Sequence, residues 1–308
     1  MAASRGGRPL PTAALGDPPT EVRRKASIEL RDSRVTERLE ELAARFAAYD
    51  GTSLAFRGGG SGPPLILVHG SGSDGRRWAP VLSFLEARFR CFALDRRGHG
   101  ESGDAASYSL EKEFDDIAAL SKSLDSGLID VVGHSYGALC ALGAACMPGV
   151  ARRLVLYEPP LPFGEGAYFQ KGLVAEMRAA LARQDPEAAI LAFALDVFAM
   201  PPEAIAAMRQ REGWEALVAS APRMLRELEA VERIAQSPEI FSACRVPTLL
   251  LVGAESPPQY HETARALAAI LPSARIERLA QQGHGAIDAA PARFAAAALA
   301  FLTLNQGN

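Results

Sequence analysis

The stretch Leu128-Ile-Asp-Val-Val-Gly-His-Ser-Tyr-Gly-Ala-Leu-Cys-Ala-Leu-Gly-Ala-Ala-Cys-Met147 decides the fold. It opens with a short apolar run, Leu128 to Val132, whose length and β-branched residues are typical of a buried strand. The segment after Gly137 is rich in alanine and leucine and predicts a helix. Between the two stands Gly-His-Ser-Tyr-Gly, a Gly-x-Ser-x-Gly pattern at a sharp strand-to-helix turn. Such a turn holds a serine hydroxyl above the sheet, so we predict that Ser135 is a nucleophile; the alternative is a glycine-rich connection without chemistry.

Length and composition bound the class of protein. The 308 residues are enough for a large core, either as two domains or as one α/β domain with an insertion. Hydrophobic residues make up 48% and the mean hydropathy is +0.02, which is typical of a globular protein. The formal net charge of −3 gives no general attraction to nucleic acid or to an anionic membrane. No apolar run approaches the roughly 18 residues of a membrane span, and residues 1–20 lack the apolar core of a secretory signal, so we expect a cytoplasmic protein.

Cysteine usage and motifs argue against metals and cofactors. All four cysteines fall in apolar stretches without C-x-x-C spacing, which predicts reduced core residues rather than disulfides or a zinc site. They are Cys91, Cys140, Cys146 and Cys244. The sequence contains no phosphate loop, dinucleotide fingerprint or metal-ligand cluster. We therefore expect neither a cofactor nor a metal.

The N-terminal part of the chain predicts an extension and a hairpin. Residues 1–32 are polar and contain scattered prolines, which favours disorder. Residues 33–46 carry apolar side chains at helical spacing and predict a short amphipathic helix. Arg45 to Tyr49 and Ser53 to Phe56 could pair as strands around Asp50-Gly51, a strong hairpin turn.

Strands and helices then alternate, which predicts a mostly parallel sheet with helices on both faces. The strands are expected at 65–68, 90–94, 128–132, 153–157, 247–253 and 274–279, and the helices between and after them at 77–87, 110–124, 262–271 and 291–302. The alternation stops between the fourth and fifth of these strands, where five helical segments follow one another, at 172–183, 186–198, 202–211, 214–220 and 224–234. We therefore predict an α/β core of residues 33–160 and 243–308 with a helical lid, residues 161–242, inserted into it.

The motifs in this order resemble the α/β-hydrolase family. The resemblance covers residues 45–303 and rests on four landmarks: His69-Gly70, the run Asp-Arg-Arg-Gly-His-Gly-Glu-Ser at 95–102, the turn at 133–137, and Gly283-His284 before the last helix. It implies the α/β-hydrolase fold, a serine nucleophile, and a general base in the loop after the last strand, which is His284. It also implies that the 95–102 run is a structural turn beside the active site, without a catalytic role.

Four other histidines are assigned to different places. His134 neighbours the nucleophile, but alternate residues of the turn point apart, so it should pack beneath the turn. His69 and His99 resemble residues that brace the family's loops. His261 lies near the start of a polar helix and is expected in solvent.

The third member of the triad departs from the family pattern. A serine nucleophile needs a base, and the base needs a carboxylate that fixes its tautomer. In the family, the strand that corresponds to 247–253 is usually followed by Gly-x-x-Asp. Here the sequence is Gly253-Ala-Glu-Ser256, so a serine stands where the aspartate is expected. We favour Glu255, one residue earlier, as the acid. Glu158, at the end of the preceding strand, is the reserve candidate, because a triad is defined by geometry rather than by sequence position.

Acyl transfer also needs donors for the oxyanion of the tetrahedral intermediate. One should be the backbone N–H of Tyr136, at the start of the helix after the nucleophile, where the helix dipole helps. The other should be the backbone N–H of Ser71, the residue after His69-Gly70.

The predicted lid contributes apolar side chains and three arginines. The apolar residues are Phe163, Phe169, Phe193, Phe198, Met200, Met208 and Trp214. They favour a pocket for a small, largely apolar substrate, although such side chains also pack a lid on its core. Arg178, Arg209 and Arg223 could anchor a carboxylate.

These features together predict a cofactor-free serine hydrolase that cleaves an ester, thioester or lactone through an acyl-enzyme. A carbon–carbon bond hydrolase and a perhydrolase or haloperoxidase-like enzyme use the same triad and remain alternatives. A non-catalytic ligand-binding protein of this fold is a further alternative, because the usual aspartate is missing. The sequence predicts no oligomeric state.

Overall fold

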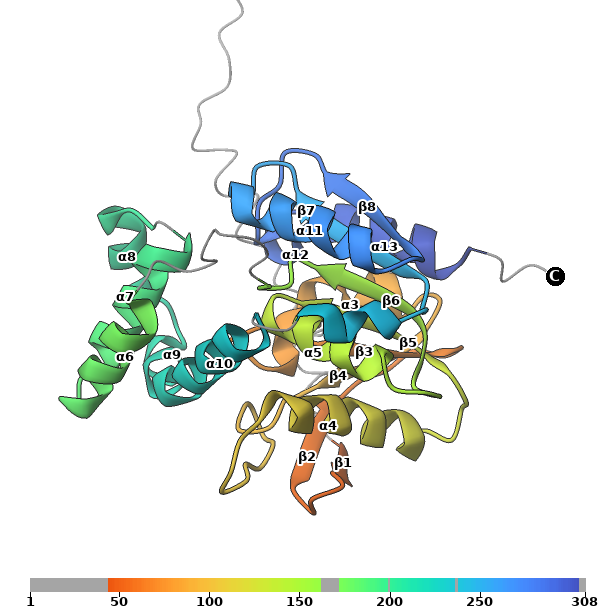
Figure 1. Cartoon of the computed structure of the whole chain (residues 1–308), viewed down its shortest axis with the longest axis horizontal. Coiled ribbons are helices and arrows are strands. Elements are labelled where there is room, and N and C mark those ends of the chain that lie inside the picture. The colour runs from red at the N-terminus through yellow and green to blue at the C-terminus, as the bar shows by residue number, and fades with distance from the viewer. Residues whose placement is uncertain (1–43, 162–171, 199, 236–237, 305–308) are drawn as a thin grey trace, which may run out of the picture.

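A computed structural model of the chain describes residues 44–161, 172–198, 200–235 and 238–304. Its centre is an eight-stranded sheet with the order β1-β2-β4-β3-β5-β6-β7-β8 (Figure 1). The strands are β1 (Ala44–Ala47), β2 (Ser53–Arg57), β3 (Pro64–Val68), β4 (Arg90–Leu94), β5 (Ile129–His134), β6 (Ala151–Tyr157), β7 (Thr248–Gly253) and β8 (Ala274–Leu279). From β4 to β8 all neighbours are parallel, which confirms the predicted mostly parallel sheet.

The first two strands form the predicted hairpin and the antiparallel edge of the sheet. Ala47 pairs with Ser53 across the turn at Asp50-Gly51, and β2 then pairs antiparallel with β4. The helix predicted over 33–46 is wrong in its last three residues, because 44–46 belong to β1. Pairing with β2 decides this local conflict, since a strand next to an existing sheet gains a ladder of hydrogen bonds. The rest of that helix and the extension 1–32 lie outside the described residues.

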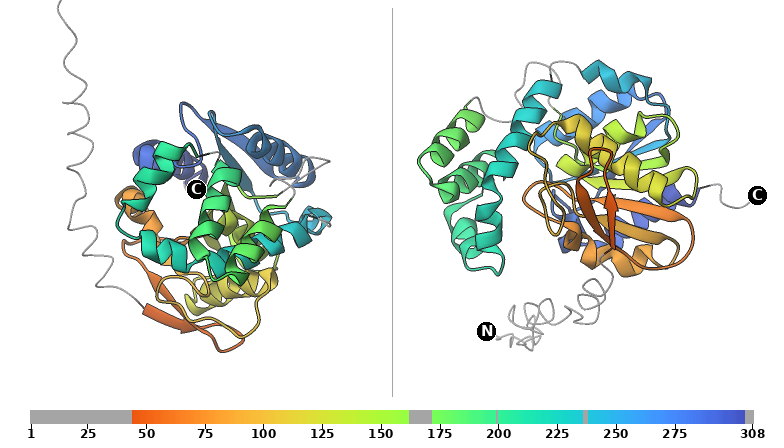
Figure 2. Two further views of the ribbon diagram at one scale, coloured as in Figure 1. Left: turned by 90° about the vertical axis from the view of Figure 1, so that its left-hand side faces the viewer. Right: turned by 90° about the horizontal axis from the view of Figure 1, so that it is seen from below.

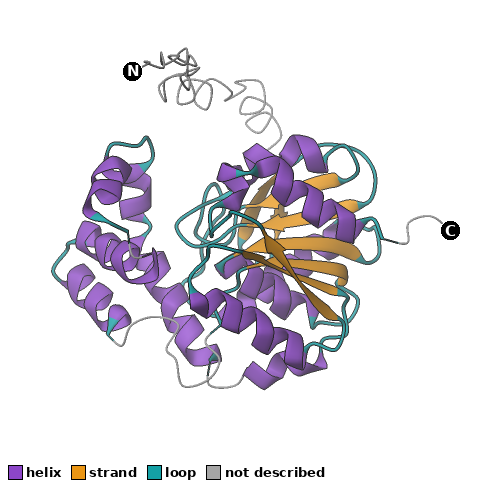
Figure 3. Ribbon diagram, turned by 90° about the horizontal axis from the view of Figure 1, so that it is seen from above, coloured by secondary structure: helices purple, strands orange, loops and turns teal. Residues whose placement is uncertain are grey.

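Helices cover both faces of the sheet (Figure 3). One apolar core lies under α4 (Leu110–Ser123), α5 (Tyr136–Ala145) and α11 (Pro258–Ile270), and the other under α3 (Ala79–Leu85) and α13 (Pro291–Leu302). The central strands are buried on both faces, so their side chains are apolar without alternation. Three short elements were not predicted: the 3-10 helices η1 (Gly75–Trp78) and η2 (Pro238–Ala243), and α12 (Ala286–Ala289).

Among the described residues, five α-helices lie between β6 and β7 near the predicted helical segments: α6 (Leu173–Ala182), α7 (Pro186–Phe198), α8 (Pro202–Arg209), α9 (Trp214–Ala219) and α10 (Ala221–Ile234). We call them the helical insertion. In Figure 1, α6 to α9 stand beside the core and α10 runs back to it; Figure 2 shows the whole insertion, in green to teal, on one side of the sheet. Its helices share an apolar core of their own around Met177, Ile190 and Leu228.

Most of the cysteines lie in the interior of this fold. Cys91, Cys140 and Cys244 are buried and Cys146 is partly exposed, and all four are free thiols. Across the described ranges, no helix is long and apolar enough to cross a membrane. Those ranges also contain no group of three or more His, Cys, Asp or Glu side chains that could hold a metal ion.

Candidate active site

Ser135 occupies a strained turn between β5 and α5. Its backbone has φ of +52° and ψ of −127°, a conformation that is unfavourable for a residue with a Cβ and that tends to occur at functional sites. The turn is held because the Ser135 N–H donates to the Tyr157 carbonyl at 2.8 Å. A Cβ on Gly133 would lie 2.5 Å from the Cα of Ala138, so the strand and the helix can cross this closely only at a glycine.

Gly137 provides the first testable consequence. A Cβ there would overlap the carbonyl oxygens of Val68 and His69, which are backbone atoms of a central strand and cannot move aside cheaply. We expect Gly137→Ala to lower the free energy of unfolding by about 3 kcal/mol, as overpacking in a tight core does. Urea denaturation measures this change. Gly285→Ala is the control, since nothing lies within 4 Å of its Cβ position, and an equal loss in both variants would contradict the expectation.

His284 and Glu158 form a hydrogen-bonded pair. His284 Nδ1 lies 2.5 Å from Glu158 Oε2, and the glutamate side chain is buried. An Nδ1–H that donates to this carboxylate leaves Nε2 of His284 free to accept a proton. Glu158 follows β6 directly and, like Ser135, has a positive φ, +52°. The pair therefore has the geometry of a general base and the acid that orients it.

The structure contradicts the prediction that the Glu255 carboxylate contacts His284. Glu255 is exposed, and Glu158 occupies the place at His284 Nδ1. The other oxygen of Glu158, Oε1, accepts from the Gly253 N–H at 2.7 Å and from the Ser256 hydroxyl at 2.5 Å. The serine that replaces the family's aspartate thus holds the glutamate of the neighbouring strand. Because β6 and β7 are adjacent and parallel, their carboxyl ends present side chains to the same point.

Aromatic rings surround the His284 side chain. The ring centroid of Tyr260 lies 4.9 Å from that of His284, His134 lies at 4.6 Å and Phe198 at 5.6 Å. The Tyr157 hydroxyl donates to the Gly283 carbonyl and accepts from the Ala286 N–H, so it holds the loop that carries the histidine. Sequence reasoning missed Tyr157 and Tyr260. The only available signal was that Tyr157 directly precedes Glu158 at the end of a strand.

Three of the remaining histidines, His134, His69 and His261, contact backbone groups. His134 is buried, stacks on Tyr157 and contacts the His284 carbonyl through Nε2 at 3.1 Å. Burial and the nearby His284 lower the pKa of His134 well below its usual value, so it stays neutral. His69 Nδ1 lies 2.8 Å from the Gly70 carbonyl oxygen, and its Nε2 accepts from the Arg96 N–H. His261 is partly buried with Nε2 3.1 Å from the Ser256 carbonyl oxygen, so the expectation of a solvated ring is wrong.

The two predicted oxyanion donors belong to residues near the serine: Tyr136 follows it, and Ser71 follows Gly70, which packs against it. A Cβ on Gly70 would lie 2.9 Å from Ser135 Cβ and 3.5 Å from its Oγ, so the loop that carries Ser71 passes directly against the serine. Tyr136 is the first residue of α5, where a helix leaves its N–H groups unsatisfied. Within the described residues, the N–H groups of Ser71 and Tyr136 donate to no backbone carbonyl. Both are therefore available to a ligand oxygen.

The 95–102 run braces this loop, as predicted. Asp95 accepts from the N–H groups of Gly75 and Glu101 and forms an ion pair with Arg57. Arg96 is fully buried and donates to the His69 carbonyl at 2.9 Å and to the Gly70 carbonyl at 3.2 Å. These bonds fix the loop against the sheet.

The helical insertion touches the site at two places. Phe198, the last residue of α7, approaches the His284 ring, and Leu217 and Met224 reach Gly72 in the loop after β3. Two of the three arginines proposed as carboxylate anchors have partners: Arg178 pairs with Glu229 and Arg209 with Glu187, each at 2.6 Å. Arg223 has no acidic partner in the part of the chain that the structure describes. Phe163 and Phe169 lie outside that part.

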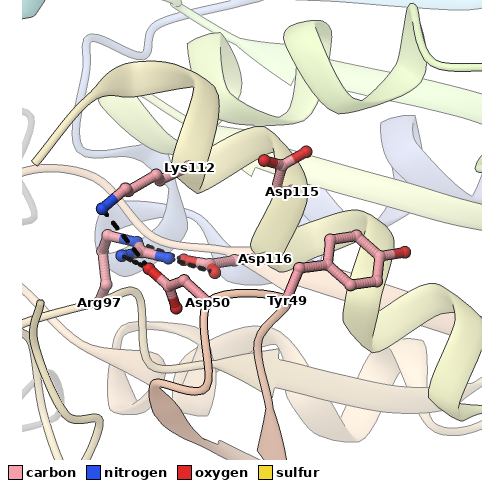
Figure 4. A pocket seen from close by; sticks show the side chains of 6 residues that line it. All are labelled: Tyr49, Asp50, Arg97, Lys112, Asp115 and Asp116. Atoms are coloured by element: carbon pink, nitrogen blue, oxygen red, sulfur yellow. Dashed lines mark hydrogen bonds and ion pairs between the residues drawn. The ribbon is translucent and has the colours of Figure 1, made fainter.

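A separate pocket of about 240 Å³ lies between the β1–β2 turn and α4 (Figure 4). Its cations are already neutralised: Arg97 pairs with Asp116 at 2.6 Å and with Asp50 at 3.1 Å, and Lys112 lies 3.6 Å from Asp50. In Figure 4 these side chains point toward one another. The cluster ties the hairpin to α4, and both of the cations that line the pocket already have an acidic partner.

Comparison with known proteins shows which sequences this chain resembles. The model of the alpha/beta hydrolase family matches residues 65–297. "Putative carbamate hydrolase RutD" of Pseudomonas syringae pv. syringae (strain B728a) is 30% identical over 252 residues, which are 78% of this chain and 94% of that protein. "Putative non-heme bromoperoxidase BpoC" of Mycobacterium tuberculosis (strain CDC 1551 / Oshkosh) is 38% identical over 91 residues, 29% of this chain and 35% of that protein. The chain thus matches about a third of the length of BpoC.

Solved structures show the same fold. The crystal structure of an alpha/beta hydrolase from Sphaerobacter thermophilus DSM 20745 has a TM-score of 0.75 and 32% identity, and the alignment covers 84% of this chain and all of the other. The sheet order and the surrounding helices define an alpha/beta hydrolase fold. The chain belongs to the alpha/beta hydrolase family.

Proposed function

We propose that the protein is a serine hydrolase that cleaves a carboxylic ester, thioester or lactone through an acyl-enzyme. One observation carries the proposal: His284 Nδ1 lies 2.5 Å from the buried Glu158 carboxylate, and the His284 ring lies 4.6 Å from that of His134, which directly precedes the serine held at positive φ. A serine hydroxyl becomes nucleophilic when such a base takes its proton. The family membership supports hydrolysis, and the choice among these acyl groups is our proposal.

The proposed reaction begins with formation of the acyl-enzyme. Ser135 Oγ attacks the acyl carbon while His284 Nε2 takes its proton, and the Glu158 carboxylate stabilises the imidazolium that forms. The N–H groups of Ser71 and Tyr136 meet the negative charge on the former carbonyl oxygen. When the intermediate collapses, His284 returns the proton to the leaving alcohol or thiol, and the acyl group stays on Ser135.

The second half repeats these steps with water. His284 takes a proton from water, the hydroxide attacks the acyl carbon, and the acid departs as Ser135 Oγ regains a proton. The helical insertion acts as a lid in this proposal: Phe198 lies over the His284 ring, and Leu217 and Met224 lie against the loop that carries Ser71. These apolar contacts suit a small, largely apolar substrate.

A fluorophosphonate probe and a substrate panel test the proposal. Intact-mass spectrometry of the wild-type protein should show one adduct, and peptide mapping should locate it on Ser135, because only an activated serine displaces fluoride at a useful rate. Turnover of p-nitrophenyl esters, thioesters, lactones and carbamates, assayed in parallel, ranks the bond types. Absence of an adduct at Ser135 together with no turnover in any class would contradict the proposal.

Perhydrolysis is the second candidate, favoured by the similarity to the protein named as a bromoperoxidase. Here hydrogen peroxide replaces water, its oxygen attacks the acyl carbon of the acyl-enzyme, and a peracid leaves. Formation of peracid from an ester and hydrogen peroxide, lost on blocking Ser135 with the fluorophosphonate, is the distinguishing measurement.

A further inference from the structure

A buried ion network joins the helical insertion to the loop that carries Ser71. Glu227 of α10 is only 1% exposed, and its Oε1 lies 2.7 Å from Arg96 Nη2 and 2.8 Å from His99 Nε2. Arg96 is fully buried, and its Nη1 donates to Glu113 of α4 at 2.8 Å. Burial alone would raise the pKa of Glu227, but Arg96 and His99 hold it well below its usual range, so Glu227 remains an anion.

The same guanidinium reaches the backbone next to the serine. Arg96 Nε donates to the His69 carbonyl and Nη2 to the Gly70 carbonyl. The Gly70 carbonyl and the Ser71 N–H belong to one peptide unit, which is planar and trans, so its oxygen and hydrogen point in opposite directions. An anchor on the Gly70 oxygen therefore sets the direction of the Ser71 N–H. A hydrogen bond to that oxygen also polarises the peptide and strengthens its N–H as a donor.

We propose that Glu227 and Arg96 are positioning residues for the oxyanion hole, through which α10 of the insertion orients the Ser71 N–H. Nη2 of Arg96 is shared between Glu227 and the Gly70 carbonyl, so the carboxylate of the insertion helps to fix where that nitrogen lies, together with Glu113 and the His69 carbonyl. Neither side chain touches the substrate. The inference rests on the proposed function, because it assumes that an oxyanion forms beside Ser135.

A purely structural role would have a different signature. If Glu227 only fastened the insertion to the core, its loss would lower stability or loosen substrate binding, and the rate of the bound complex would be unchanged. A positioning role instead acts in the transition state, where charge on the oxyanion has developed. It therefore lowers kcat and leaves KM almost unchanged.

Glu227→Gln tests this distinction, and Glu229→Gln is the matched control. Both residues lie on α10 and pair with an arginine, but Glu229 is partly exposed and its partner Arg178 is exposed, whereas Glu227 and Arg96 are buried. On an ester that the wild type hydrolyses, we expect kcat of Glu227→Gln to fall about 10- to 100-fold with KM little changed, since an error of about 1 Å at a donor costs that much. Glu229→Gln should match the wild type.

An alkyl boronic acid gives a second readout. Its boron adds to the serine oxygen while His284 takes the serine proton, which gives an anionic tetrahedral boronate with a boron-bound oxygen in the place of the oxyanion. Its inhibition constant should therefore rise by the same factor as kcat falls. The result that overturns the proposal is equal kcat in Glu227→Gln and Glu229→Gln, or a raised KM at unchanged kcat. Circular dichroism shows whether Glu227→Gln folds. If it does not, Glu227→Asp takes its place, because aspartate keeps the charge but is too short to reach Arg96 in the same way. We expect the same loss of kcat in Glu227→Asp, and a wild-type kcat there overturns the proposal.

This outcome is distinguishable from failure of the proposed function. A wild-type protein that neither reacts with fluorophosphonate nor turns over any acyl substrate refutes the function. A wild-type protein that does both, beside a fully active Glu227→Gln, refutes only the role of the network.

Discussion

Ser135→Ala should lower kcat about 10⁶-fold on any ester that the wild-type protein hydrolyses, as loss of a triad nucleophile does in other serine hydrolases. The reason is that Ser135 carries the hydroxyl at the strained turn between β5 and α5, directly before the Tyr136 N–H that we propose as an oxyanion donor. Alanine fits the same space, so the fold should remain intact. Steady-state kinetics and thermal unfolding of both proteins measure the two parts of this expectation.

His284→Ala is the companion variant, because nucleophile and base act as a unit. Each single variant should lose about as much activity as the double variant Ser135→Ala/His284→Ala. Losses that multiply in the double variant would show that the two side chains act independently. Residual activity close to wild type in folded Ser135→Ala would remove the serine mechanism altogether.

The fold could be predicted because each element carries its own local signal. The apolar run at 128–132 has strand length and β-branched residues, and the glycines and prolines within residues 161–242 predict where helices stop. Where the local signal was ambiguous, strand pairing determined the structure. Residues 44–46 belong to a segment with apolar side chains at helical spacing, yet they form a strand that is hydrogen-bonded to β2. Short elements such as α12 carry too few residues for periodicity to be visible.

The serine and the histidine could be placed because their motifs are continuous in sequence. The acid could not, since its position depends on how two neighbouring strands end. Glu158 and His284 are separated by 126 residues and meet only because β6, β7 and β8 are adjacent. Sequence position favoured Glu255, but the backbone there turns its side chain outward, while Ser256 turns inward and is buried.

The contacts between the insertion and the core were equally invisible in the sequence. Glu227 lies on a helix whose charged residues are mostly solvated, and nothing local distinguishes it from Glu229. Arg96 and Glu227 are 131 residues apart, and their ion pair depends on the direction in which α10 returns to the sheet. Buried charges are costly unless paired, so the arginine in the 95–102 run indicated that a carboxylate would be near, but not which one.

Relocating the acid by one strand preserves the chemistry because Ser256 and Gly253 rebuild its surroundings. Their donors hold Glu158 Oε1, which leaves Oε2 to face Nδ1 of His284. An aspartate after β7 would have needed the same histidine nitrogen. The His284 imidazole therefore still has one carboxylate partner, Glu158. The loop after β7 contributes hydrogen bonds to this carboxylate instead of a charge of its own.

Glu158→Gln should lower kcat about 10⁴-fold, whereas Glu255→Gln should remain nearly as active as the wild type. Glutamine keeps the shape of the side chain but loses the charge that stabilises the imidazolium, and its amide can force the wrong tautomer on His284, an effect of that size in a comparable triad. Glu255 is exposed and makes no contact with the histidine, so its charge has no such role. Kinetics of both variants on one ester, with fluorophosphonate labelling rates beside them, separate the two carboxylates. An inactive Glu255→Gln next to an active Glu158→Gln would reverse the assignment and show that the loop after β7 supplies the acid during turnover.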